Sequence, residues 1–307
     1  SVQVFGGENG SFDSSLGVVS AAEYGKVFIS IVATTGLNLT ASEKKQLVAD
    51  FAKYTVASIT PVIVDPDTTF LILNVSFKYD SNRTSSNLSE IESEVVSAIT
   101  SYNTNNLGEF EQLFRHSQVT RLIDDAQDSI LSNTTNITLG KLFTPTTTAA
   151  TSYYIYFNNA LYNPHSGHNA ASGGILSSTG FFISGDTTNE HFLDDNGAGI
   201  VRLYYLQVGE RVYVDSTAGT IDYATGEVFI ESIFITTISD VDGVASTQVR
   251  LTVIPNSKDI APVRNQLLKI DLTNTTVTGQ VDTVAVGDGS AGGTYTTNTS
   301  YSTPSGY

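Results

Sequence analysis

The sequence contains no Cys, no Met and no Trp, and these absences exclude several kinds of chemistry. Without Cys, the chain can form neither a disulfide framework nor a thiolate site. No apolar run approaches the ~20 residues that a membrane-spanning helix needs, and no basic-apolar signal peptide stands at the start. Because residue 1 is Ser1 and not Met, we expect a processed chain or a part of a longer protein.

Charged residues are also scarce, and most of them are acidic. They make up 15% of the 307 residues, and the formal net charge is −16. An acidic surface repels phosphate backbones and anionic headgroups, so neither nucleic acid nor a membrane is an expected partner. The rest of the composition favours β-structure, since Thr and Tyr suit strands and Asn and Ser suit turns.

Residues 1–143 are predicted to form an α/β domain. Apolar runs indicate strands at residues 24–32, 61–64, 70–77 and 130–143. In the third of these, every second side chain is apolar and is expected to face the core, namely Leu71, Leu73, Val75 and Phe77.

Two capping boxes predict helix starts, because a polar cap is followed three residues later by Glu. They are Thr40 with Glu43, and Asn87 with Glu90. The second helix carries an apolar stripe made of Leu88, Ile91, Val95, Ile99 and Tyr102, and Gly108 ends it. A third helix is expected to carry Phe110, Leu113, Phe114 and Leu122. This order of elements predicts a small sheet with helices packed on one face.

A Thr-rich linker at residues 144–151 separates this domain from a β-rich domain at residues 152–283. Helical periodicity ends there, and strand-like runs alternate with Gly, Asn and Asp turns, which is typical of a sandwich. These runs are residues 153–157, 180–183, 199–206, 211–214, 227–230, 233–235, 248–254 and 266–270. The fold class is therefore α+β, and residues 284–307 are expected to form a flexible tail.

Two segments resemble fragments of metal sites. His165 and His168 lie three residues apart, with Asp194 or Asp195 as a distant third ligand, but a polar turn is the favoured interpretation. Residues 240–243, Asp-Val-Asp-Gly, begin like a calcium loop. Leu251 occupies the twelfth position, where a loop of that kind needs a Glu, so a hairpin turn is favoured. The turn at residues 194–197 is interpreted in the same way, and no metal residue is assigned.

Asp65 and Asp67 flank Pro66 and form an acid/base pair only if a cleft holds them together. Pro66 restrains Asp65 to extended geometry, which also suits a turn, and the turn is favoured. No nucleophile elbow, phosphate loop or metalloprotease helix is present. No catalytic or cofactor-binding residue is assigned, and the chain is not expected to be an enzyme.

Two blocks near the start resemble a known family. Phe-Gly-Gly-Glu at residues 5–8 precedes Tyr-Gly-Lys-Val-Phe-Ile-Ser-Ile at residues 24–31. This order resembles the baseplate wedge proteins of T-even-like contractile phages, within the baseplate J-like group. Phe5 stands where that family has Trp, and the spacer is longer here. Further similar blocks are residues 58–67, 70–79, 162–167, 219–226 and 264–271.

The resemblance implies a structural virion subunit, corresponding to the C-terminal part of a longer wedge protein and assembled in the host bacterial cytoplasm. Proteins of that family form dimers, contact other wedge proteins and help to close a ring around the tail hub. The family offers no catalytic residue to carry over. Two alternatives remain at this point: a surface adhesin or carbohydrate-binding β-module, and a hydrolase that uses Asp65, Asp67 or the His165/His168 pair.

Overall fold

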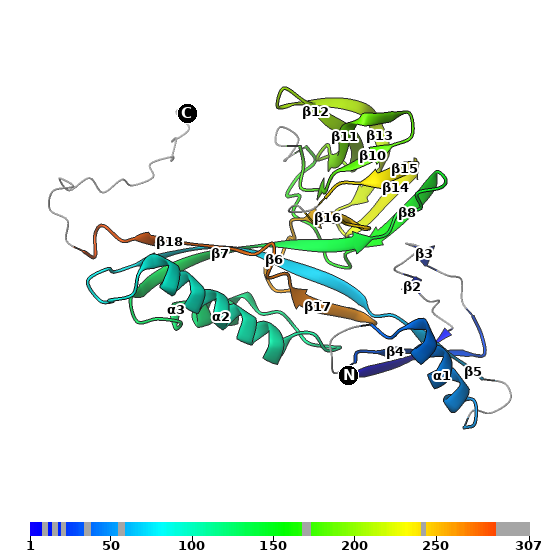
Figure 1. Ribbon diagram of the computed structural model, residues 1–307, viewed down its shortest axis with the longest axis horizontal. Coiled ribbons are helices and arrows are strands. Elements are labelled where there is room, and N and C mark those ends of the chain that lie inside the picture. Colours follow the sequence, from blue (N-terminus) through cyan, green and yellow to red (C-terminus); the bar gives the residue numbers. More distant parts are fainter. Residues whose placement is uncertain are drawn as a thin grey trace.

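The computed structural model describes residues 1–7, 12–13, 18–19, 23–33, 38–54, 59–167, 173–240 and 244–286. Within these ranges the chain is α+β and mostly strand (Figure 1). The helices are α1 (Ala41–Phe51), α2 (Leu88–Asn106) and α3 (His116–Asp124). None of the helices in the described ranges is long and apolar enough to cross a membrane.

The strands fall into one small sheet, one hairpin and one large sheet. Their bounds are β1 (Val2–Gly6), β2 (Phe12–Asp13), β3 (Val18–Val19), β4 (Lys26–Ile31), β5 (Thr60–Val64), β6 (Asp67–Tyr79), β7 (Ile130–Phe143), β8 (Thr151–Tyr156), β9 (Ser177–Ser178), β10 (Phe181–Ile183), β11 (Asp186–Asp195), β12 (Ile200–Gln207), β13 (Glu210–Asp222), β14 (Glu227–Ile233), β15 (Ile235–Ile238), β16 (Val249–Val253), β17 (Gln266–Ile270) and β18 (Thr276–Val281).

The small sheet has the order β1-β4-β5 and packs beside α1. Strand β1 runs antiparallel to β4, and β4 runs parallel to β5. The capping box at the start of α1 is present, since Thr40 and Glu43 exchange their hydrogen bonds. No residue of α1 is fully buried, and Figure 1 places this helix at the margin of the molecule. Helix α1 is therefore thinly packed.

The main helical core lies where α2 and α3 cover β6 and β7 (Figure 1). The alternation predicted for β6 is confirmed, because its inward side chains are at most 1% exposed: Leu71, Leu73, Val75 and Phe77. The Asn87 capping box is also present. The stripe of α2 is buried from Ile91 to Tyr102, whereas Leu88, at the first turn, is 37% exposed.

The prediction for the third helix was wrong at its start. Helix α3 begins at His116, so Phe110, Leu113 and Phe114 precede it. Phe114 is fully buried, but its backbone pairs with Ile260 through hydrogen bonds of 2.9 and 3.1 Å. A helix would have to satisfy those same backbone groups internally, so this distant partner determines where the helix starts.

The large sheet joins segments from both sides of the predicted linker. Its main path is β17-β6-β7-β16-β9-β11-β12-β13-β14-β8. Strand β7 ends at Phe143 and β8 begins at Thr151, on either side of the Thr-rich segment. Strands β17 and β18 fall in the range predicted for the β-rich domain, yet both pair in parallel with β6. The chain thus returns at its end to the sheet where α2 and α3 pack.

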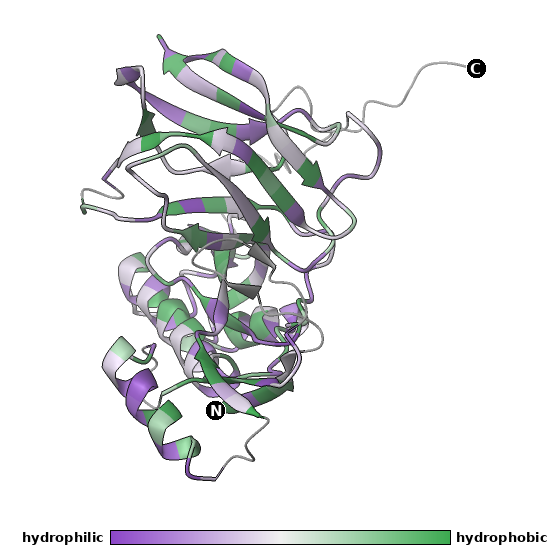
Figure 2. Ribbon diagram, turned by 90° about the vertical axis from the view of Figure 1, so that its right-hand side faces the viewer, coloured by the Kyte–Doolittle hydropathy of each residue, from purple (hydrophilic) through white to green (hydrophobic). Residues whose placement is uncertain are grey.

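The β-rich part of the sheet curls back on itself. Strand β15 continues β14 after Phe234 and pairs with β10, which pairs with β11. Since β11 to β14 are paired in order, the pairings lead from β15 through β10 and β11 round to β14, and this part of the sheet is curled. The ring centroids of Phe143 on β7 and Tyr153 on β8 are 4.9 Å apart, although β7 and β8 are distant in strand order. Figure 2 shows hydrophobic and hydrophilic residues alternating along these strands.

Candidate functional site

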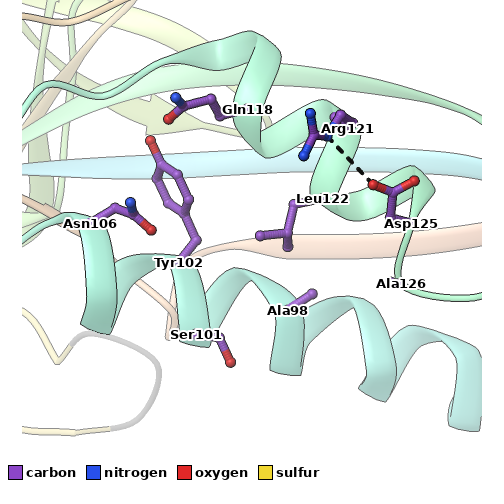
Figure 3. A pocket seen from close by; sticks show the side chains of 9 residues that line it. All are labelled: Ala98, Ser101, Tyr102, Asn106, Gln118, Arg121, Leu122, Asp125 and Ala126. Carbon is purple, nitrogen blue, oxygen red and sulfur yellow. Dashed lines mark ion pairs between the residues drawn. The ribbon is translucent and has the colours of Figure 1, made fainter.

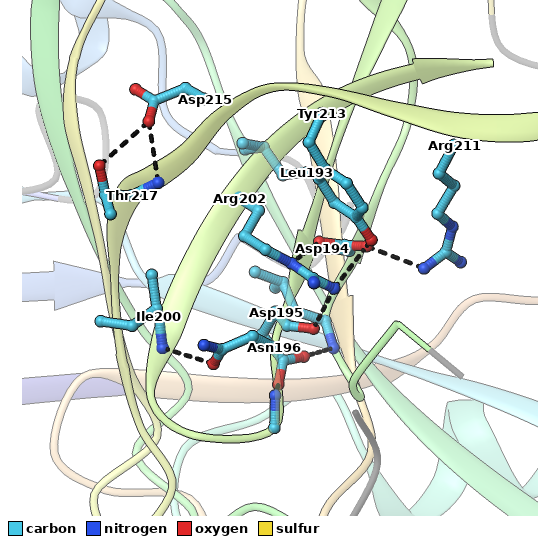
Figure 4. Close-up of polar contacts among 12 residues, drawn as sticks. Leu193, Asp194, Asp195, Asn196, Ile200, Arg202, Arg211, Tyr213, Asp215 and Thr217 are labelled. Atoms are coloured by element: carbon cyan, nitrogen blue, oxygen red, sulfur yellow. Dashed lines mark hydrogen bonds and ion pairs between the residues drawn. The ribbon is translucent and has the colours of Figure 1, made fainter. Parts of the chain in front are cut away.

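A polar cluster around one buried carboxylate crosses the three neighbouring strands β11, β12 and β13 (Figure 4). At its centre is Asp194, which is 1% exposed. Arg202 from β12 binds both of its carboxylate oxygens, with Nε–Oδ1 at 2.9 Å and Nη2–Oδ2 at 3.1 Å. Arg211 and Tyr213 from β13 each donate to Oδ2 at 2.8 Å. One carboxylate therefore fixes the relative position of three strands.

Aromatic rings complete this cluster. The Arg202 guanidinium lies 4.2 Å from the centroid of the Tyr213 ring, and that of Arg211 lies 4.9 Å from the Tyr204 ring. Burial raises the pKa of Asp194, although the hydrogen bond from Tyr213 and the pairing with Arg202 and Arg211 counteract that rise. The cluster is therefore a stacked arrangement of Arg and Tyr side chains around one carboxylate.

Asp195 faces the opposite side of β11 and is fully buried. Its Oδ1 accepts the backbone N–H groups of Ile175 and Leu176 at 2.6 and 2.7 Å. Its Oδ2 accepts the N–H of Gly197 at 2.9 Å and the hydroxyl of Tyr223 at 2.6 Å. The carboxylate thus holds two loops against the sheet.

The approach of this carboxylate to the backbone requires a glycine. Gly174 has φ of +78°, and a Cβ there would lie 2.0 Å from Oδ1 of Asp195. An L side chain is therefore excluded by both backbone conformation and space.

The chemistry available to this cluster is limited, because both carboxylates already have partners. Asp194 binds two guanidinium groups, and Asp195 accepts four hydrogen bonds. A general base needs an accessible lone pair, and a metal site needs several free oxygen or nitrogen ligands. The arrangement instead links strands β11, β12 and β13 through their side chains.

Tyr223 gives this part of the fold an alkaline sensitivity. Burial and the hydrogen bond to Asp195 raise the pKa of Tyr223 well above its usual range. The folded state therefore holds this proton more tightly than the unfolded chain does. The resulting stabilisation is complete below the unfolded pKa of about 10 and is lost as the pH rises above it.

We expect the free energy of unfolding to fall more steeply between about pH 9 and about pH 11 in the wild type than in Tyr223→Phe. Urea unfolding followed by circular dichroism at both pH values measures the difference. Parallel decreases in the two proteins would show that Tyr223 does not contribute in this way.

The structure separates only some of the residues that the sequence grouped together, and it places the loop of His165 beside the turn after Asp195, since the N–H of Gly167 donates to the carbonyl of Gly197 at 2.7 Å. Asp65 pairs with Lys44 at 2.5 Å, whereas Asp67 pairs with the buried Lys141, so the two carboxylates serve different lysines. His165 lies in the described loop, with its Nδ1 3.3 Å from the carbonyl of Ser166. His168, residues 241–243 and residues 287–307 lie outside the described residues. Among those described, no three His, Asp or Glu side chains are grouped to hold a metal ion.

A shallow groove runs between α2 and α3 (Figure 3). Its volume is about 490 Å³, and Tyr102, Ala98 and Leu122 supply apolar surface. Arg121 and Asp125 form an exposed ion pair at 3.5 Å along its edge. Such a pair contributes little to stability, so this edge can be rearranged at low cost.

The unit formed by residues 1–64 exposes apolar side chains. Val2 and Val4 on β1 are each 59% exposed, and Tyr24 and Tyr54 are 84% and 86% exposed. The two sequence blocks that resemble the baseplate family meet here, since Phe5 on β1 pairs with Phe28 on β4 and their rings stack at 5.6 Å. Glu8, the last residue of the first block, lies outside the described residues.

Comparison with known proteins gives three consistent findings. Residues 1–64 match the family described as baseplate structural protein gp6, C-terminal domain I. Residues 67–142 match the family described as baseplate structural protein gp6, C-terminal domain III. The baseplate wedge protein gp6 of Enterobacteria phage T4 is 26% identical over 113 residues, which is 37% of this chain and 17% of that protein. The chain thus covers only about a sixth of its relative's length, and the matches agree with one another: residues 1–64 and 67–142 are similar to the C-terminal part of the baseplate structural protein gp6.

Proposed function

We propose that this protein is a structural subunit of a contractile phage tail baseplate wedge, where it forms the protein–protein contacts of a ring around the tail hub. The observation that carries this proposal is the pair of adjacent family matches, which follow each other along residues 1–64 and 67–142. The first coincides with the β1-β4-β5 sheet and α1, and the second with β6, α2, α3 and β7. The adhesin alternative has no comparable support.

The partners in this proposal are other baseplate wedge proteins and a second copy of the chain as a homodimer. Exposed Val2, Val4, Tyr24 and Tyr54 support protein contact, because Tyr is enriched at interfaces. Permanent assemblies often bury more than about 2,000 Å². The thin packing of α1 is consistent with a unit that gains further contacts on assembly.

The proposed location is the virion, with assembly in the host bacterial cytoplasm, and the proposed role is non-catalytic. Full occupation of the Asp194 and Asp195 carboxylates supports a structural role for these two buried groups. The proposal also includes a domain boundary at residues 144–151 and a sandwich-like character for the β-rich part. The rings of Phe143 on β7 and Tyr153 on β8 lie 4.9 Å apart, which supports a sandwich-like packing of these strands. Strands β17 and β18, in contrast, pair with β6 of the first domain.

Size-exclusion chromatography with light scattering tests this function. The purified chain is measured alone and after mixing with each purified baseplate wedge protein of the same phage. We expect a dimer alone and a larger complex with at least one wedge protein. A strict monomer that binds none of them contradicts the proposal. Binding to glycans that a chelator abolishes would instead favour the adhesin.

A further inference from the structure

The hairpin formed by β12 and β13 carries an apolar side chain in its loop, where burial of that side chain contributes nothing to the stability of the fold. Strand pairing continues to Gln207 opposite Glu210, so Val208 and Gly209 form a two-residue loop. The Val208 side chain is 98% exposed. Figure 1 shows β12 and β13 on the side of the molecule away from α2 and α3.

The backbone conformation at position 208 is energetically unfavourable for Val. Its φ is +54°, and that of Gly209 is +85°. Positive φ at both loop positions is what a type I′ turn requires, and Asn-Gly is the favoured pair there. A β-branched residue with positive φ is a genuine outlier. An exposed, strained Val thus stands where Asn would fit the turn better, so stability of the hairpin does not account for it.

The end of the hairpin is apolar beyond Val208, and its base is rigid. Besides Val208, Leu206 stands at this end of the hairpin, where it pairs with Arg211, and it is 51% exposed. Behind them, the bonds from Arg202, Arg211 and Tyr213 to Asp194 fix both strands. A rigid projection loses little conformational entropy when it binds, which is the condition that favours a preorganised contact.

We propose that the tip of the β12–β13 hairpin inserts Val208, flanked by Leu206, into an apolar recess on another protein of the baseplate. This inference rests on the proposed function and names the kind of partner. The recess is expected to have a basic rim, because Glu210 directly follows the loop, the adjacent Arg211 is paired with Asp194, and the chain carries a net charge of −16. An anionic membrane surface would be repelled by the same charge.

The variant Val208→Asn distinguishes a role of Val208 in binding from a role in stabilising the hairpin. Asn suits the positive φ, so the variant should fold with a Tm equal to or above that of the wild type, while the apolar contact is lost. Val284→Asn is the matched control, because Val284 is 68% exposed and lies elsewhere, after β18. The dissociation constant of the full chain with each purified wedge protein is measured by biolayer interferometry.

We expect Val208→Asn to raise the dissociation constant for one wedge protein by about 10-fold or more, because it removes the burial of a whole Val side chain. Val284→Asn should leave it unchanged. Unaltered binding by Val208→Asn overturns the inference but leaves the proposed function intact. A wild type that binds no wedge protein overturns both.

Two further outcomes overturn the choice of partner. If Val208→Asn disrupts only self-association in light scattering, the recess belongs to a second copy of this chain. If the wild type sediments with phosphatidylcholine vesicles and Val208→Asn does not, the hairpin contacts lipid. Neither is expected.

Discussion

Replacing Asp67 with Ala is expected to lower the free energy of unfolding by about 3–5 kcal/mol, because it leaves a buried cation without its partner. The side chains of Lys141 and Asp67 are 6% and 8% exposed, and their ammonium and carboxylate groups are in contact. Burial lowers the pKa of Lys141 even with Asp67 present. Without the carboxylate, Lys141 must either remain charged in an apolar site or give up its proton.

The matched control lies two residues away in the same Asp-Pro-Asp motif. Asp65 pairs with Lys44, and the two side chains are 37% and 25% exposed, so solvent screens this pair. We expect Asp65→Ala to cost less than about 1 kcal/mol. Urea unfolding of both variants measures the difference. Equal losses would mean that the burial of the Asp67–Lys141 pair has no energetic consequence.

Removing the Asp195 carboxylate is the second change with a large expected effect. Asp195→Ala leaves the buried N–H groups of Ile175, Leu176 and Gly197 without their acceptor. Each such group costs about 1–3 kcal/mol, so we expect a total loss of about 3 kcal/mol or more. Amide hydrogen exchange should also show faster exchange at these three positions.

Asp195→Asn is the conservative comparison. Its side-chain oxygen can still accept from Ile175 and Leu176, but its NH₂ group cannot accept from Gly197. The loss is therefore expected to be smaller than in Asp195→Ala, with Gly197 the most affected amide. If the two variants are equally stable, the carboxylate does not hold the loops through these bonds.

Local signals made part of this fold predictable. Capping boxes located the starts of α1 and α2, because Thr40 and Asn87 accept a hydrogen bond within their own turn. Alternation identified the inward face of β6, since its pattern depends only on neighbouring residues. Strands β7 and β17 were predicted with the same bounds that the structure has.

Other elements depend on distant partners and were missed. Strand β11 contains His191, Asp194 and Asp195, all buried, so its sequence does not alternate between apolar and polar residues. The Asp195 carboxylate is satisfied by Ile175 and Tyr223, which lie 20 and 28 residues away. Strand β18 is short and contains Gly279, and only its parallel pairing with β6 defines it.

The candidate site was missed for a related reason. The sequence drew attention to Asp194 and Asp195 as neighbours of a glycine turn, but not to Arg202, Arg211 or Tyr213. Alternate residues Arg211 and Tyr213 share one face of β13, and this spacing was the available signal. Strand pairing was needed to place that face against Asp194.

Gold-labelled antibodies against this chain, applied to purified particles of the phage that encodes it and viewed by electron microscopy, test the central claim most directly. The account predicts that labels lie at the baseplate end of the tail, in a ring around its axis. Absence of the chain from the particles, or labels confined to the head or the tail fibres, would contradict it.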